Sequence, residues 1–308
     1  MKEFKRIIVT GADGMLGRGF KQVLSEGDSG CLDCLFLSHL DLDVTNLDEV
    51  MRLTEYSPDL IIHCAALVNA DFCESNYQQA FDVIVGGTEN IISLAEKTHA
   101  KVFYPQSFLI FDGIENPITE ETKPNPLSTY GKLKLEAEQK LLESTVSSLI
   151  VRMAGFFGGM EKDKNFVGKF IVHLIELIKK DIRSVDVGDR VWQPTYTKDL
   201  ALNSMLLLNE NHDGIYNMSC HGEASFYELA VKIVENLDLN SKITINQVSS
   251  EKFNTKEPAK RPLKAIFNNK KLHDNGLDIQ RSWIISLQEY LSEPYFKKLL
   301  IESGVKDD

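Results

Sequence analysis

The chain has 308 residues, of which 43% are hydrophobic and 26% are charged. This composition is typical of a globular protein with one large domain or two merged ones. Its 34 Lys and Arg against 45 Asp and Glu give a net charge of -11, which repels polyanions, so neither nucleic acid nor an anionic membrane is an expected partner. We find no apolar stretch near the roughly 20 residues of a spanning helix and no signal peptide, and we therefore expect a cytoplasmic protein.

The first half of the chain alternates short β-branched runs with amphipathic segments of helix length. The expected strands are residues 6–10, 34–37, 60–64, 101–107 and 148–153. The expected helices between them include residues 48–56, 77–98 and 127–144. This alternation predicts an α/β fold, a doubly wound parallel sheet of the Rossmann type with helices on both faces.

The rhythm changes after Met153 and indicates a smaller, discontinuous α+β domain. Here the expected helices are residues 166–180, 226–238 and 283–292, and the expected strands are residues 183–187, 215–219 and 242–248. We assign residues 1–155 to a dinucleotide-binding domain to which 181–212 return, and 156–180 with 213–308 to a substrate-binding domain. A ligand cleft is expected between them, over the carboxyl ends of the strands.

A glycine-rich loop follows the first expected strand and leads into an amphipathic helix. Gly11, Gly14 and Gly17 are spaced by three residues each. Gly11 permits a sharp turn, Gly14 lets the backbone approach a pyrophosphate, and Gly17 permits close packing of helix and strand. This order of strand, loop and helix predicts a dinucleotide site at a helix amino end. Its expected contacts are Gly11, Asp13, Gly14, Met15, Leu16 and Gly17.

The end of the second expected strand indicates which dinucleotide binds. An NAD site usually has an acidic residue about 20 residues after the glycines, but this position is near Ser38-His39. With Arg18 as a cationic partner for a 2′-phosphate, the sequence favours NADPH, with NADH tolerated. Asp43 and Val44 are expected at the adenine edge, although solvation of a loop is the alternative for these acidic positions.

Tyr130 and Lys134 are four residues apart in an expected helix and therefore share one face of it. Asn125 is the expected cap of this helix, and Pro126 is its expected first residue. A neighbouring ammonium favours the phenolate of tyrosine and makes it a usable proton donor. Ser107 ends the preceding strand. The fold would bring hydroxyl, phenol and amine together where the nicotinamide is expected.

Five cysteines, an odd number, favour a reducing compartment over a disulfide framework. Cys31 and Cys34 have the spacing of a redox or zinc motif, but no second pair would complete four ligands. We expect no metal.

Together these motifs resemble the extended short-chain dehydrogenase/reductase superfamily and, more closely, the dTDP-4-dehydrorhamnose reductase family. The resemblance extends through most of the chain. It rests on the glycine loop, on residues 63–71 with Cys73-Glu74, on Ser107 with Phe111-Asp112-Gly113, and on residues 130–134. Later matches are Pro194-Thr195-Tyr196, Asp199-Leu200-Ala201, Gly214-Ile215-Tyr216-Asn217, and Arg261-Pro262 ahead of Asn268 and Leu272.

The resemblance implies that Ser107, Tyr130 and Lys134 are catalytic, that Tyr130, Lys134, Ala65, Ala66 and Leu67 also contact the cofactor, and that the reaction reduces a nucleotide-linked 4-keto-6-deoxyhexose. Expected substrate contacts are Val68, Asn69, Phe108, Phe156 and Trp192, although a place for Trp192 in the core is an equal alternative.

The chain departs from the family pattern at a few positions. Ser107-Phe108-Leu109-Ile110-Phe111 replaces the usual Thr-Asp-Tyr-Val-Phe, Ile84 replaces Asn, and Trp192-Gln193 stands where Gly-Ser is common. Two alternatives therefore stay open: a nucleotide-sugar 4-epimerase of the same superfamily, and a non-catalytic NADP-binding subunit like the regulatory partner of methionine adenosyltransferase. The apolar faces of residues 91–95 and 133–142 belong either to the core or to a homodimer interface.

Overall fold

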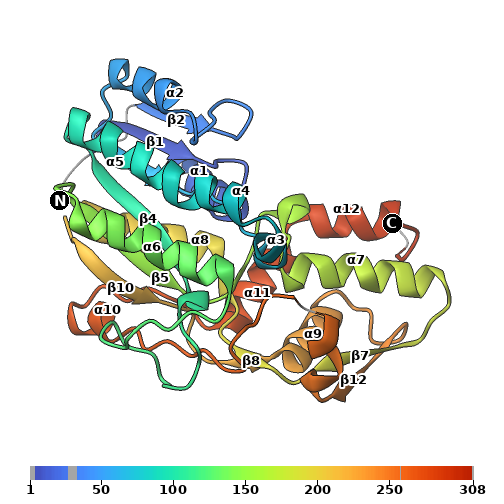
Figure 1. The fold of residues 1–308 in the computed structure, drawn as a ribbon. Coiled ribbons are helices and arrows are strands. Elements are labelled where there is room, and N and C mark those ends of the chain that lie inside the picture. Colours follow the sequence, from blue (N-terminus) through green and yellow to red (C-terminus); the bar gives the residue numbers. More distant parts are fainter. Residues whose placement is uncertain (1–3, 27–32, 257, 307–308) are drawn as a thin grey trace.

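The computed structural model describes residues 4–26, 33–256 and 258–306, and its centre is a six-stranded parallel sheet (Figure 1). The order is β2-β1-β3-β4-β5-β10, and every neighbouring pair is parallel. The strands are β1 (Arg6–Thr10), β2 (Asp33–Leu37), β3 (Leu60–His63), β4 (Lys101–Ser107), β5 (Ser148–Met153) and β10 (Gly214–Met218). The doubly wound fold expected from the sequence is confirmed.

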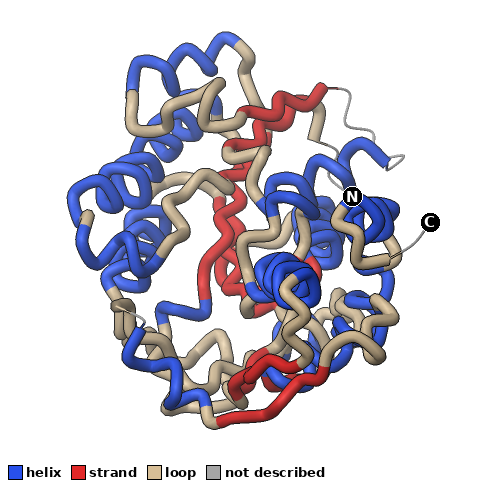
Figure 2. The backbone as a smooth tube through the Cα atoms, turned by 90° about the vertical axis from the view of Figure 1, so that its right-hand side faces the viewer, coloured by secondary structure: helices blue, strands red, loops and turns tan. Residues whose placement is uncertain are grey.

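Helices cover both faces of this sheet (Figure 2). Ile7 and Val9 of β1 belong to the core under α1 (Met15–Glu26) and α8 (Thr197–Asn209). Ile8, which points the other way, belongs to the core under the helices of the opposite face. Those helices are α2 (Leu47–Arg52), α5 (Gly87–Thr98) and α6 (Thr129–Glu143). Burial on both faces explains why these strands are continuous apolar runs.

The apolar sides of α5 and α6 face this core. Ile91, Leu94, Leu133 and Leu141 are fully or almost fully buried in it, whereas Leu142 is about half exposed. A short helix, α4 (Tyr77–Phe81), joins α5 through a π-helical turn at Asp82–Gly86, so residues 77–98 are helical throughout, as expected.

The second half forms its own core, to the right of the sheet in Figure 1. Four helices surround it: α7 (Phe166–Lys179), α9 (Phe226–Asn236), α11 (Trp283–Leu291) and α12 (Pro294–Glu302). Three two-stranded sheets lie beside them: β7 (Ser184–Gly188) with β12 (Thr244–Val248), β8 (Val191–Trp192) with β11 (Ala224–Ser225), and β6 (Phe156–Phe157) with β9 (Thr195–Tyr196). The other short helices are α3 (Ala70–Ser75) and α10 (Lys270–Asp274). No helix among the described residues is long and apolar enough to cross a membrane.

Two strands differ from the expected domain boundaries. β10, expected in the substrate-binding domain, pairs with β5 in the central sheet. β7, expected to return to the dinucleotide-binding domain, pairs with β12 instead, whereas α8 does return and packs against α1. The sequence pattern identifies a strand, but its partner is chosen by packing between segments far apart in the chain, which that pattern does not record.

Candidate active site

The connections reverse direction at β1, which pairs with β2 on one side and β3 on the other. In open α/β sheets, ligands bind outside the carboxyl ends of the strands at such a switch point. Gly11 follows β1 and Ala65 comes soon after β3, so the two segments meet there. The switch point therefore lies beside the glycine-rich loop.

The glycine-rich loop has no room for side chains at two of its glycines. Gly11 has a φ of +62°, and a Cβ on it would lie 2.7 Å from the Ala65 nitrogen. A Cβ on Gly17 would lie 2.3 Å from the Gly11 carbonyl oxygen. The Gly14 N–H donates to that same oxygen at 3.0 Å, and α1 begins at Met15. A bare backbone turn before a helix amino end fits the pyrophosphate of a dinucleotide.

A loop from the second half of the chain covers the first turn of α1. The Lys164 N–H contacts the Met15 sulfur at 3.4 Å, and a Cβ on Gly159 would lie 3.2 Å from the Met15 Cα. Leu16 is buried in the core, so only its backbone is available to a ligand. Asp13 lies at the rim, 3.6 Å from His39 Nδ1.

The end of β2 differs from what the sequence predicts. Ser38 donates from its hydroxyl to Asp41 at 2.6 Å, and this bond holds the pKa of the Asp41 carboxyl below its usual range. A carboxylate therefore does stand at this position, because the chain turns back on itself after Ser38. Arg18, expected to be available to a 2′-phosphate, forms an ion pair with Glu161 at 2.7 Å.

These side chains line part of a cavity of about 550 Å³. Its wall includes Asp13, Arg18, Phe36, Ser38 and Asp41, with Tyr196 and Tyr290 on the side of the second domain. Asp43 and Val44 lie after this turn: the Asp43 carboxylate accepts from Thr45, and Val44 is buried against Gly87. The site thus combines anionic and cationic groups.

Ser107, Tyr130 and Lys134 do come together. Ser107 is the last residue of β4, and its side chain lies near the Tyr130 phenol, close to the start of α6. Burial raises the pKa of Tyr130, and the nearby Ser107 hydroxyl opposes that effect. The cap expected at Asn125 is wrong: the Ser128 hydroxyl accepts from the Gly131 N–H instead, and α6 begins at Thr129.

Lys134 is buried one turn further along α6. Its ammonium donates to the Pro105 carbonyl at 2.8 Å and lies 3.9 Å from the centre of the Tyr104 ring. Burial lowers the pKa of Lys134 to about 7, against the opposing effect of the Glu138 carboxylate. This amine therefore changes charge near neutral pH.

His63 ends β3 beneath this group and is buried. Its Nδ1 lies 2.9 Å from the Thr10 hydroxyl, and its Nε2 lies 3.4 Å from the Thr88 hydroxyl. Burial, together with the Lys134 charge, lowers the pKa of His63 to about 3. The ring is therefore neutral at physiological pH and acts in the hydrogen-bond network rather than as a charge.

Two of the five expected substrate contacts lie together. Trp192 is 9% exposed and fills the space beside Gly155, where a Cβ would lie 2.4 Å from the indole ring and 3.7 Å from Phe108. The ring centres of Trp192 and Phe226 are 5.3 Å apart.

The other three expected contacts have other surroundings. Val68 is exposed, and Asn69 uses its side-chain oxygen to cap α3 through the Phe72 N–H at 3.1 Å. Phe156 packs against the core that contains Leu16.

An ion pair that sequence reasoning assigned no role joins the two halves of the chain. The Arg261 guanidinium binds both carboxylate oxygens of Asp71 in α3, at 3.2 and 2.8 Å. Arg261 also holds the pKa of the Asp71 carboxyl below its usual range. The sequence marks both residues only as landmarks of the family, because nothing in it pairs positions 190 residues apart.

Of the two cysteines with the spacing of a redox or zinc motif, Cys34 lies half-buried in β2, whereas Cys31 lies outside the described residues.

The model of the RmlD substrate binding domain family matches residues 5–296. A dTDP-4-dehydrorhamnose reductase of Aggregatibacter actinomycetemcomitans is 31% identical over 78% of this chain and 84% of its own length. The structure of a dTDP-4-dehydrorhamnose reductase of Bacillus anthracis in complex with NADP is 30% identical, with a TM-score of 0.83 over 95% of this chain and all of that one. Methionine adenosyltransferase 2 subunit beta of Rattus norvegicus is 27% identical over 93% of this chain and 87% of its own. With a family model over nearly its whole length and reductases at about 30% identity, the chain belongs to the dTDP-4-dehydrorhamnose reductase family.

Proposed function

We propose that this chain is an NADPH-dependent oxidoreductase that reduces the keto group of a nucleotide-linked 4-keto-6-deoxyhexose, with dTDP-4-dehydrorhamnose as the substrate and NADH as a second donor. One observation carries the proposal: Ser107, Tyr130 and Lys134 converge at the end of β4, in a chain whose relatives at about 30% identity are reductases of this name.

The chemistry follows from the groups present. When bound, NADPH would supply the hydride that the carbonyl carbon accepts. The Tyr130 phenol gives its proton to the carbonyl oxygen, which becomes the new hydroxyl. Ser107 holds that oxygen by a hydrogen bond where negative charge develops. Lys134, when protonated, stabilises the phenolate that remains and holds a ribose hydroxyl of the cofactor.

For the cofactor we propose backbone contacts from the glycine-rich loop, because helix amino ends bind pyrophosphate. Asp13, Ser38, Asp43 and Val44 would surround the adenosine, and Ala65, Ala66 and Leu67 the nicotinamide ribose. For the sugar we propose Phe108 and Trp192, whose packing at Gly155 beside Ser107 supports the assignment. Val68, Asn69 and Phe156 are further candidates, of which Asn69 is the weakest because its side chain caps α3.

The experiment is turnover of dTDP-4-dehydrorhamnose with NADPH, followed at 340 nm and by chromatography of the product. Equimolar loss of NADPH and formation of dTDP-rhamnose are expected. Interconversion of 4-epimers without net loss of NADPH would instead assign the protein to the epimerases. Cofactor binding without turnover of this substrate or related keto sugars would favour the non-catalytic role suggested by the methionine adenosyltransferase relative.

We further propose that the protein works in the cytoplasm, where nucleotide sugars are made, and that it forms a homodimer. On α6, Leu142 is about half exposed, whereas Leu133 and Leu141 are buried in the core. Leu142 is therefore available to such an interface. Sedimentation equilibrium at micromolar concentration tests the homodimer.

A further inference from the structure

We propose that Gln106 is a positioning residue for the catalytic trio: its side-chain amide fixes the distance between the end of β4, which carries Ser107, and helix α6, which carries Tyr130 and Lys134. This inference rests on the proposed function for its kinetic consequence. The hydrogen bonds that Gln106 makes to β4 and α6 do not depend on the identity of the substrate.

The amide of Gln106 contacts both elements. Its Nε2 donates to the Lys134 carbonyl oxygen and to the Glu138 carboxylate, each at 2.9 Å. Its Oε1 accepts from the Ser107 N–H at 2.8 Å. Gln106 is 3% exposed, so water does not compete for these bonds. One buried side chain thus joins the serine to the turn of helix that bears the lysine.

The amide has one stable orientation. Turned over, its oxygen would face a carbonyl oxygen and a carboxylate, while its NH₂ group would face the Ser107 N–H. All three bonds would then be repulsive contacts between like groups. The link therefore defines a position and does not tolerate a second rotamer.

The helix side of the link is equally fixed. Tyr130, Lys134 and Glu138 are each four residues apart, so they share the face of α6 that packs on β4, and all three are buried. The Glu138 carboxylate receives Arg152 of β5 on Oε1 at 2.5 Å and on Oε2 at 3.4 Å. Because Arg152 neutralises and orients Glu138, that carboxylate is a rigid anchor for Gln106.

Each of the last three residues of β4 lies against α6. The Pro105 carbonyl oxygen accepts from the Lys134 ammonium, and the Gln106 amide donates to the Lys134 carbonyl oxygen and the Glu138 carboxylate. The Ser107 side chain lies near the Tyr130 phenol. Of these links, that of Gln106 involves no group assigned to the chemistry. It can therefore be removed while all three reacting groups are kept.

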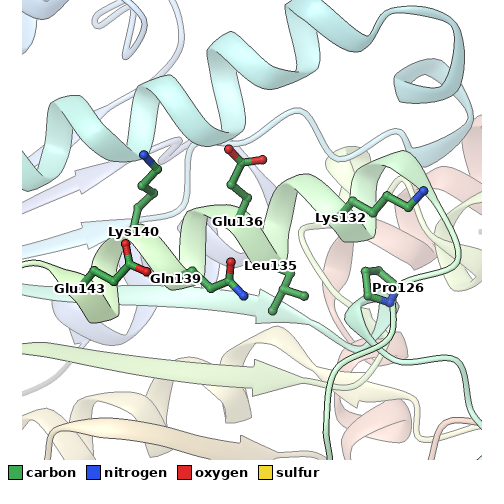
Figure 3. A pocket seen from close by; sticks show the side chains of 7 residues that line it. All are labelled: Pro126, Lys132, Leu135, Glu136, Gln139, Lys140 and Glu143. Atoms are coloured by element: carbon green, nitrogen blue, oxygen red, sulfur yellow. The ribbon is translucent and has the colours of Figure 1, made fainter.

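The test is Gln106→Met, which keeps length and volume and removes all three bonds. We expect kcat to fall about 10- to 100-fold while the KM for the keto sugar and the Kd for NADPH stay within about threefold, because misplacement by a fraction of an ångström affects the reacting geometry more than binding. The control is Gln139→Met at an exposed position of the same helix, which is labelled in Figure 3; its kcat should equal that of the wild type. Unchanged kcat in Gln106→Met would overturn the proposal.

A second pair of variants covers the case in which Gln106→Met does not fold. Gln106→Glu places two carboxylates against each other, and Gln106→Glu with Glu138→Gln restores an amide beside a carboxylate with the donor reversed. We expect the kcat of the double variant to be at least tenfold higher than that of Gln106→Glu alone. A merely structural residue would change the melting temperature without this recovery, and failure to recover would contradict the proposal.

Crystal structures of the wild type and of whichever Gln106 variant folds separate this inference from the proposed function. We expect the distance between the Ser107 hydroxyl and the Tyr130 phenol oxygen to increase in the variant. If the wild type reduces no keto sugar, the proposed function fails, and this distance still decides whether Gln106 positions the trio. An unchanged distance would count against it.

Discussion

The Lys134 ammonium donates to the Pro105 carbonyl oxygen at 2.8 Å, so the amine assigned to the cofactor is tied to the strand that ends at Ser107. Among the described residues, no carboxylate is paired directly with Lys134. The Glu138 carboxylate, one turn along the helix, is bonded to Arg152 and Gln106. Burial therefore outweighs the opposing effect of Glu138, and the pKa of Lys134 falls to about 7.

Cofactor affinity should therefore depend on pH. The protonated amine attracts the anionic cofactor, so binding raises the pKa of Lys134, and affinity is highest below pH 7 and falls as pH rises above it. The fall is at most about tenfold per pH unit for one proton. Fluorescence titration with NADH, which lacks a titrating 2′-phosphate, measures it from pH 6 to 9. Lys134→Met should bind weakly with a flat profile, whereas exposed Lys132→Met should keep the wild-type slope; a slope retained in Lys134→Met would refute the assignment.

Replacing Tyr130 should separate catalysis from binding. Tyr130→Phe removes the proton that the carbonyl oxygen needs, and we expect kcat to fall roughly 10²- to 10⁴-fold. The ring still fills its buried place in the core, so the Kd for NADPH should stay within about twofold. Steady-state kinetics and calorimetric binding measure the two effects. The matched control is Tyr77→Phe at an exposed position, and turnover of Tyr130→Phe equal to this control would exclude Tyr130 as the acid.

His63 should make the fold sensitive to acid. Its pKa is about 3 in the folded protein and 6.5 in the unfolded chain, so between these values the unfolded state binds a proton that the native state does not. The free energy of unfolding therefore decreases as pH falls from about 6.5, by up to about 1.4 kcal/mol per pH unit. Urea unfolding at pH 7 and pH 5 measures it. His63→Asn should lose this contribution, and His99→Asn, an exposed helix cap, should keep it; equal slopes in both variants would contradict the prediction.

The glycine-rich loop should reject even one methyl group at Gly17. A Cβ there would meet the Gly11 carbonyl oxygen at 2.3 Å, so Gly17→Ala should lower stability by about 1–3 kcal/mol and weaken NADPH binding at least tenfold. Gly86→Ala is the matched control, because its Cβ would meet nothing within 4 Å and the residue is helical. That variant should gain about 0.4–1 kcal/mol. Wild-type affinity in Gly17→Ala, measured by thermal shift and fluorescence, would show that the loop does not form the phosphate site.

Much of this architecture is predictable because it is local. The period of apolar residues and the length of each segment predict β4 and the π-interrupted helix at residues 77–98. The spacing of Tyr130 and Lys134 places both on one face of α6. α6 begins at Thr129, two residues after the expected start at 127, and its side-chain cap is Ser128, three residues after the expected Asn125. Capping depends on which oxygen reaches the first turn, and the composition near a helix start allows several candidates.

Most of what the sequence does not predict is non-local. The Asp71 pair with Arg261, the carboxylate that returns to Ser38, and the link from Gln106 to Glu138 each depend on how distant segments or a tight turn come together. The signal for Glu138 is present, since it continues the four-residue spacing of Tyr130 and Lys134. Gln106 carries no such signal, because only the packed strand and helix bring its amide to that face.

Trp192 occupies the volume that a side chain at position 155 would need. The two positions are therefore coupled: a large residue at 155 requires a small one at 192, and either replacement alone produces a clash or a void beside Phe108. An evolutionary path between the two arrangements must pass through both as small residues or change both at once. A family member with the bulk at 155 would bring it in from the segment between β5 and β6 instead of from β8, and so present a different wall beside Phe108.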